Sequence, residues 1–172
     1  MISKVLSRCA AAILIAGVAS LGFADEHEKK PSAESPSIEG TYKLISRKLP
    51  DGKMLSGRDI IGLFTFTKTH RNFNIAWKDS TGKHWSHSVV STYKLTSTEY
   101  TETILLSITN DEIGGKGIRY TMTGSPRGFP VKMDGGRIEF RMPFDPVSVV
   151  FDGDKFTGTN EGVFVDSWEK VK

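Results

Sequence analysis

The chain has 172 residues, 25% of them charged, with a formal net charge of +3 and a single cysteine, Cys9. Lys4 and Arg8 contribute two of the 23 basic residues, and none of the 20 acidic residues precedes residue 25, so residues 25–172 carry a net charge of +1 and no cysteine. A nearly neutral chain lacks the basic surface typical of nucleic-acid binding, and a chain without cysteine has no disulfide. The composition therefore argues against a nucleic-acid partner. It also indicates that the hydrophobic core, with no disulfide, must stabilise the fold.

Residues 1–24 have the pattern of a secretory signal peptide. Lys4 and Arg8 form a positive start, residues 9–19 are apolar or small, and Ala24 is a small residue where a signal peptidase cleaves. The apolar run is shorter than the roughly 20 residues of a membrane span. We therefore predict cleavage near Ala24, export to a periplasm or to the medium, and a mature form without stable membrane insertion.

Residues 25–37 form a charged, proline-bearing stretch with hardly any apolar side chain. Such a segment buries too little apolar surface to build a core, so we expect a flexible leader. Residues 38–172 then make up one domain, because their number suits a single hydrophobic core.

The apolar residues of this domain recur with a period near two. Between residues 71 and 78, Phe73, Ile75 and Trp77 alternate with polar or small residues, which is typical of a half-buried strand. The turn residues 79–82 connect this strand to a longer alternating run at 84–95, so we predict a hairpin. Similar runs, separated by turn residues such as Gly and Asp, occur at 42–48, 60–69, 100–109, 118–123, 137–142, 148–151, 155–159 and 162–171.

This succession of short strands with few helical signals predicts an all-β domain. Consecutive short turns favour an up-and-down path, and closure of the sheet removes its exposed edges. We therefore expect an antiparallel up-and-down β-barrel of about 8–10 strands.

Several short motifs of these strands resemble a known family. The Gly-Thr-Tyr opening at 40–42 with the turn at 51–52, the alternating run at 73–77 and Trp168 near the end look like the small lipocalin-like domain family of calycin-type β-barrels. The resemblance implies a barrel that holds one small hydrophobic ligand, and it implies no reaction. The chain departs from larger lipocalins in having no disulfide. It departs from fatty-acid-binding proteins in the short interval 49–60, which has no room for a helical lid.

The sequence leaves open whether the barrel interior is a filled core or a cavity, because barrels of this size occur in both forms. His87 shares a strand face with Trp85, and Glu102 shares one with Tyr100. A buried carboxylate requires a partner, so an inward Glu102 would pair with His87, Tyr120 or an arginine and would give a cavity its polar handle. The alternatives are a bulge that turns Glu102 to solvent and a His87 that is a hydrogen-bonded interior residue.

The candidate ligand-binding residues are this polar pair and the aromatic residues of the alternating strands. For each aromatic residue, simple core packing is the alternative. The candidates are Phe73, Trp77, Trp85, His87, Tyr93, Glu102, Tyr120 and Phe140.

Catalytic and metal signals are weak. His84 and His87 are three residues apart, which on a strand places them on opposite faces. No serine has the Gly-x-Ser-x-Gly surroundings of an esterase nucleophile. We therefore predict no catalytic residue, no metal site and no cofactor.

Three functions remain. The first is an exported lipocalin-like protein that binds a small hydrophobic molecule inside the barrel. The second is an envelope interaction or stress protein with a filled barrel, whose loops, such as 126–130, contact another protein. The third is a small-barrel enzyme that uses His87 and Glu102 as acid and base.

Overall fold

The computed structural model of the protein describes residues 36–122 and 124–172, which form one antiparallel sheet of thirteen strands. The predicted signal peptide and residues 25–35 of the predicted leader lie outside the described residues. Within the described residues, no helix is long and apolar enough to cross a bilayer. The strands are β1 (Gly40–Lys48), β2 (Met54–Ser56), β3 (Ile60–Phe66), β4 (His70–Lys78), β5 (His84–Leu95), β6 (Glu99–Asp111), β7 (Gly117–Met122), β8 (Arg127–Pro130), β9 (Lys132–Asp134), β10 (Arg137–Arg141), β11 (Ser148–Asp152), β12 (Lys155–Asn160) and β13 (Phe164–Lys170).

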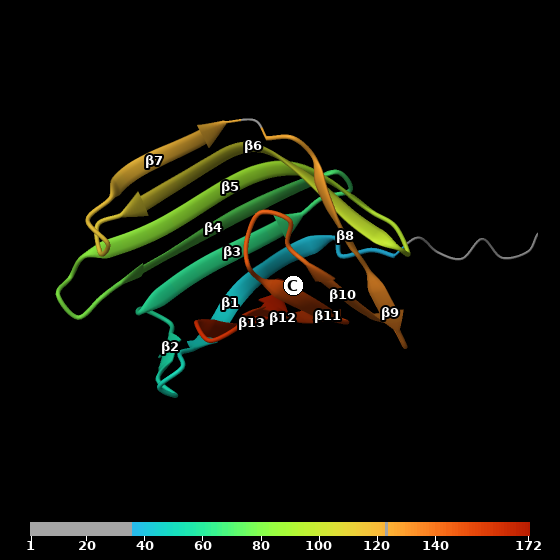
Figure 1. Cartoon of the computed structure of the whole chain (residues 1–172). Coiled ribbons are helices and arrows are strands. Elements are labelled where there is room, and N and C mark those ends of the chain that lie inside the picture. Colours follow the sequence, from blue (N-terminus) through green and yellow to red (C-terminus); the bar gives the residue numbers. More distant parts are fainter. Residues whose placement is uncertain (1–35, 123) are drawn as a thin grey trace, which may run out of the picture. The chain divides into compact units, whose positions relative to one another are not determined.

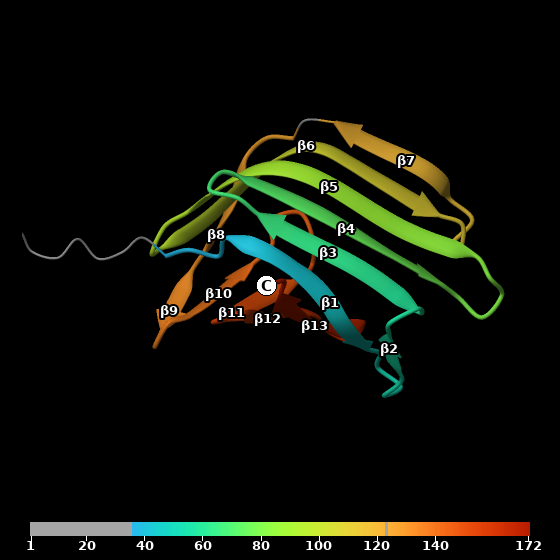
Figure 2. The same ribbon diagram turned by 180° about the vertical axis from the view of Figure 1, so that it is seen from behind.

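The all-β, antiparallel, up-and-down prediction is confirmed. The ten runs predicted as strands all form strands, and the order is β7-β6-β5-β4-β3-β1-β13-β12-β11-β10-β9. Strand β1 pairs with both β3 and β13, so the first long strand joins the last one. Figures 1 and 2 show β1 at the bend, with β3 to β7 forming one arm of the curled sheet and β9 to β13 the other.

The sheet curls into a half-barrel whose two arms are bridged at one end only. The first residues of the long strand β6 pair with β8, and its last residues pair with β7. Strand β8 leads through Val131 into β9, which pairs with β10. The backbone N–H of Val131 donates to the carbonyl of Thr98 at 2.9 Å and fixes this bridge. We predicted a loop at 126–130, yet residues 127–130 form β8.

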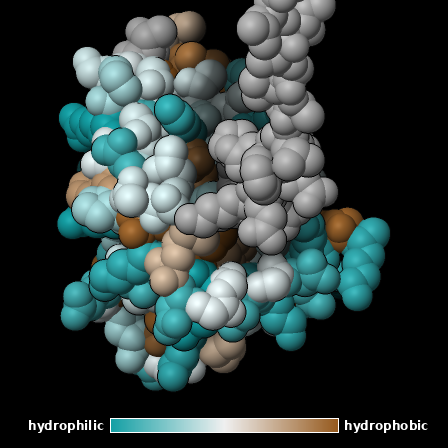
Figure 3. All heavy atoms as spheres, turned by 90° about the vertical axis from the view of Figure 1, so that its right-hand side faces the viewer, coloured by the Kyte–Doolittle hydropathy of each residue, from teal (hydrophilic) through white to brown (hydrophobic). Residues whose placement is uncertain are grey.

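The interior is filled at the bridged end. Tyr42, Phe66 and Phe151 contact one another edge to face, and Tyr100 stacks on Phe140 with ring centroids 4.2 Å apart. Strand alternation brings these rings to the inside, and their burial supplies the main driving force for folding. On the side of β8 and β9, Figure 3 shows a surface that is mostly hydrophilic, with hydrophobic residues in small separate groups. The bridged end is therefore a packed core.

A bulge in β6 sets the faces of this strand. Its pairing with β5 shifts at Leu105, between Ile104 and Leu106. The bulge follows Glu102, so Glu102 remains inward with Tyr100 and is buried. The alternative in which a bulge turns Glu102 to solvent is therefore wrong.

Glu102 is neutralised by a fully buried arginine, Arg71 of β4. The Arg71 Nε donates to Glu102 Oε1 at 2.7 Å and, more weakly, to the Ser91 hydroxyl at 3.3 Å. The Tyr100 hydroxyl donates to Glu102 Oε2 at 3.3 Å, and burial raises the pKa of Tyr100 well above its usual value, which keeps this donor protonated. One ion pair thus connects β4, β5 and β6 inside the half-barrel.

The pair is close but leaves Arg71 incompletely bonded. Arg71 Nη2 lies 2.6 Å from Glu102 Oε1, and Nη1 lies 3.9 Å from Asp145 Oδ2. Neither nitrogen makes a hydrogen bond of good geometry within the part of the chain that the structure describes. Both side chains of the pair are 0% exposed, so removal of either charge leaves the other buried without its close ionic partner.

We predict that Glu102→Leu destabilises the fold by about 3–5 kcal/mol, because it leaves the buried Arg71 charge with only the more distant Asp145, 3.9 Å away, as an ionic partner. Urea unfolding measures the change. The double variant Arg71→Met/Glu102→Leu should recover most of the loss, since an apolar pair replaces both charges. The exposed Glu99 lies on the same strand, and Glu99→Leu is the matched control. A single variant as stable as this control would contradict the assignment.

Candidate functional site

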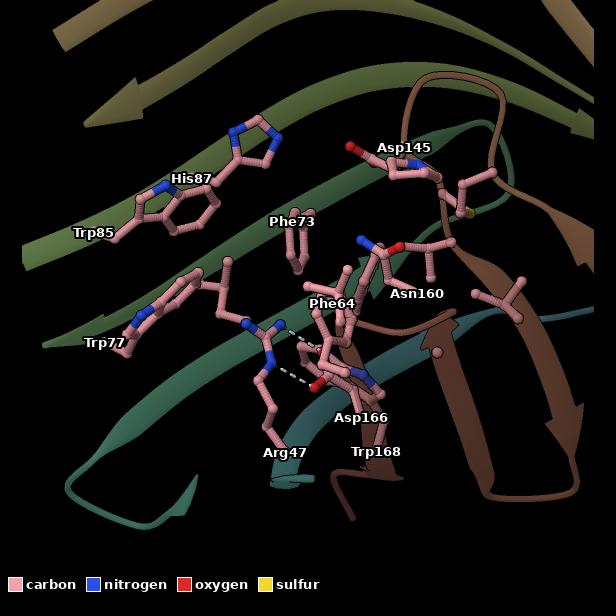
Figure 4. A pocket seen from close by; sticks show the side chains of 18 of the residues that line it. Arg47, Phe64, Phe73, Trp77, Trp85, His87, Asp145, Asn160, Asp166 and Trp168 are labelled. Atoms are coloured by element: carbon pink, nitrogen blue, oxygen red, sulfur yellow. Dashed lines mark hydrogen bonds and ion pairs between the residues drawn. The ribbon is translucent and has the colours of Figure 1, made fainter. Parts of the chain in front are cut away.

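A cavity of about 520 Å³ lies between the two arms of the sheet. One wall comes from β3 to β7, and the other from β11 to β13 and the segment 142–147; β1 and β2 add Arg47 and Leu55. Figure 4 shows its side chains converging from both arms. All three tryptophans of the chain line it. Its aromatic lining consists of Phe64, Phe73, Trp77, Trp85, Phe156, Phe164 and Trp168.

The hairpin of β4 and β5 builds one aromatic wall. Trp77 and Trp85 are direct partners in the ladder, and their rings stack with centroids 4.2 Å apart. Phe73 and Ile75 precede Trp77 at alternate positions, so strand geometry turns all three to the cavity. None of the aromatic side chains of this hairpin wall is fully buried, so part of each remains accessible to a ligand, although Trp77 and Trp85 cover one face of each other.

The opposite wall depends on Trp168 of β13. A Cβ at Gly62 of β3 would lie only 2.7 Å from the Trp168 ring, so glycine makes room for the indole. The ring stacks on Phe156 at 5.3 Å and meets Phe64 edge to face at 5.2 Å. These contacts connect the filled core to the cavity wall.

An ion pair closes the outer part of the cavity. The Arg47 guanidinium donates to both oxygens of Asp166, at 2.7 and 2.8 Å. It also lies over the ring of Phe164, 3.8 Å from the centroid, and near Trp77 at 4.8 Å. Burial raises the pKa of Asp166, and Arg47 opposes this shift. Because the two charges neutralise each other, this pair forms part of the cavity wall.

His87 of β5 is the one histidine among the residues that line the cavity. Its Nδ1 lies 2.9 Å from the Thr109 hydroxyl of β6, which orients the ring. Burial lowers the pKa of His87; Asp145 raises it and Arg71 lowers it further. In Figure 4 the His87 ring and the Asp145 carboxylate point toward one another across the cavity. The imidazole is therefore neutral at pH 7 and faces a carboxylate.

The structure brings four of the eight predicted site residues to this cavity, namely Phe73, Trp77, Trp85 and His87. The other four lie elsewhere. Tyr93 and Phe140 both stack on Tyr100 at the filled end, and Glu102 is paired with Arg71. Tyr120 lies on β7 and is 66% exposed.

The register also separates the predicted acid and base. Glu102 is the ladder partner of Tyr93, and His87 precedes Tyr93 by six residues on β5. At the rise of a strand, six residues span about 20 Å. His87 and Glu102 therefore do not form the pair that an acid–base enzyme would need.

Four charged residues of the cavity were not predicted, Arg47, Asp145, Asp166 and Arg119, the last on β7. Arg47 follows a bulge at Ile45, which turns it inward from an apparently polar run. Asp166 lies two positions before Trp168, and this spacing alone could have placed it on the inner face. Asp145 lies between β10 and β11, where no periodic signal exists.

No protein-family model, no curated protein and no solved structure matches this chain. The lipocalin-like resemblance thus rests on the residues at 40–42, 51–52, 73–77 and Trp168 and stays a prediction. Among residues 36–122 and 124–172, no group of three or more His, Cys, Asp or Glu side chains is placed to hold a metal ion.

We predict that protonation of His87 destabilises the folded protein. A histidine whose pKa is lower in the folded state than its usual 6.5 binds protons more readily when unfolded, so stability falls as the pH drops below 6.5. Urea unfolding of the wild type and of His87→Gln, between pH 7.5 and pH 5, measures this contribution. The wild type should lose more stability than the variant over this interval. Equal losses would show that the pKa of His87 is not lowered.

Proposed function

We propose that the protein binds one small hydrophobic molecule in the cavity between the two arms of the sheet. The observation that carries the proposal is the size and lining of this cavity. Its volume of about 520 Å³ falls within the range of ligand sites, roughly 300–1,000 Å³. Aromatic and aliphatic side chains make up most of the wall, so an apolar molecule loses contact with water when it enters.

The aromatic rings favour a flat ligand. The walls bring the faces and edges of Phe73, Trp77 and Trp85 to the same space, where an aromatic ligand gains offset-stacked or edge-to-face contacts. The ladder of β4 and β5 holds these side chains before any ligand arrives. A preformed wall reduces the ordering cost of binding.

The polar groups of the cavity support binding without a reaction. Arg47 and Asp166 bond each other, and the distance between His87 and Glu102 leaves no acid–base pair. If residues 1–24 direct export as the sequence predicts, the protein carries or sequesters its ligand outside the cytoplasm. A small molecule of low water solubility fits this role.

We predict that Trp85→Ala weakens the binding of naphthalene, an uncharged aromatic probe, by about tenfold, the equivalent of about 1.4 kcal/mol. The substitution removes one face of the stacked wall. Equilibrium dialysis at pH 7 measures the dissociation constant. Tyr120→Ala is the matched control, because it removes an aromatic residue that lies outside the cavity.

Two outcomes contradict the proposal. One is the absence of saturable naphthalene binding to the wild type. The other is an equal loss in Trp85→Ala and Tyr120→Ala, which would place the probe on the outer surface. Far-ultraviolet circular dichroism of both variants checks that the sheet is retained.

A further inference from the structure

One end of the cavity carries a carboxylate that makes no close ion pair with the described residues. Asp145 lies in the segment between β10 and β11, lines the cavity, and has a side chain that is 30% exposed. Its only ion pair in the described structure is with Arg71 Nη1 at 3.9 Å, which is too long for a hydrogen bond. At least one oxygen of Asp145 therefore remains able to accept a hydrogen bond from a molecule in the cavity.

The groups behind Asp145 define the charge at this place. Arg71 carries one positive charge and lies between two carboxylates, Glu102 at 2.6 Å and Asp145 at 3.9 Å. Arg71 is completely buried and does not line the cavity, so its nitrogens offer no donor to a ligand. His87 faces Asp145 as a neutral ring, because burial lowers its pKa. Arg71, Glu102 and Asp145 together carry one negative charge. Two arginines also line the cavity, Arg47, which is paired with Asp166, and Arg119 of β7, so the excess of negative charge is confined to the neighbourhood of Asp145.

This arrangement discriminates between ligands by the polar group they carry. A carboxylate ligand would place a third anion beside one guanidinium in a poorly solvated site, where repulsion is screened little. A hydroxyl group donates to the Asp145 oxygen, and a hydrogen bond to a charged acceptor is stronger than one between neutral groups. An apolar ligand without a polar group makes neither interaction and leaves the Asp145 oxygen without a partner.

We propose that the cavity selects flat aromatic molecules that carry a neutral hydroxyl group and rejects the corresponding carboxylates, with Asp145 as the acceptor of the hydroxyl hydrogen. The inference rests on the proposed function, because it names the class of ligand for the same cavity. Asp145 is a specificity residue in this account, and the aromatic wall supplies the affinity that all flat ligands share.

Three probes of the same ring system test the inference: 2-naphthol, naphthalene and 2-naphthoate. At pH 7 the naphthol is neutral and the naphthoate is ionised. Calorimetry or equilibrium dialysis with the wild-type protein should show naphthol binding about tenfold more tightly than naphthalene, and naphthoate binding more weakly than naphthalene.

Asp145→Asn assigns the selectivity to this side chain. The variant removes the charge and keeps the shape, so the preference for naphthol over naphthoate should fall by about tenfold. Asp152→Asn is the matched control, because it removes the same charge from an exposed residue that does not line the cavity. This control should keep the wild-type preference.

The outcomes separate the two proposals. If naphthalene binds but naphthoate binds as tightly as naphthol, or if Asp145→Asn keeps the wild-type preference, the inference about ligand class is overturned and the proposed function stands. If none of the three probes binds the wild type, both are overturned. Should Asp145→Asn fail to fold, the order of the three affinities in the wild type alone decides the inference.

Discussion

The buried ion pair of Arg71 and Glu102 lies where the filled core of the half-barrel ends and its cavity begins. Two opposite charges without access to water are stable only in close contact, because separation leaves each one desolvated and unpaired. Arg71 belongs to β4 and Glu102 to β6, while Ser91 of the intervening β5 also accepts from Arg71. A slip of any of these three strands would break the pair. The register that positions Trp77, Trp85 and His87 therefore depends on it.

The two ends of the interior differ because the arms of the sheet are bridged at one end only. At the bridged end, β8 and β9 connect β6 to β10, and the rings of Tyr42, Tyr100 and Phe140 fill the space between. At the other end the arms diverge, and Arg47 with Asp166 forms part of the wall. A cavity persists there because its walls are held apart by paired strands and by a satisfied ion pair.

Residue periodicity was sufficient for the long strands, and half of the residues predicted for the site line the cavity. Alternation identified all ten long strands, and the hairpin of β4 and β5 brought Phe73, Trp77, Trp85 and His87 to one face as predicted. Periodicity does not reveal how far along the half-barrel a residue lies, so Tyr93 and Phe140 were grouped with the cavity although they belong to the filled end.

The remaining errors have two physical causes. The sequence of a strand at the edge of a sheet does not show which of its faces points inward. Tyr120 lies on such a strand, β7, and it is exposed although we predicted it to line the cavity. Pairings between distant residues leave no local signal: Arg47 and Asp166 are 119 positions apart, and a bulge at Ile45 reverses the expected face of Arg47. The bulge at Leu105 is equally invisible in the alternation of β6.

The proposed binding places a flat apolar molecule in the space between the two arms of the sheet. The tryptophans offer a direct readout, because all three line this space. In a two-dimensional ¹⁵N–¹H spectrum titrated with naphthalene, all three indole N–H signals should shift, whereas the backbone signal of Met133 on β9, which does not line this space, should stay in place. Unchanged indole signals, or shifts confined to residues that do not line this space, would contradict the proposed binding.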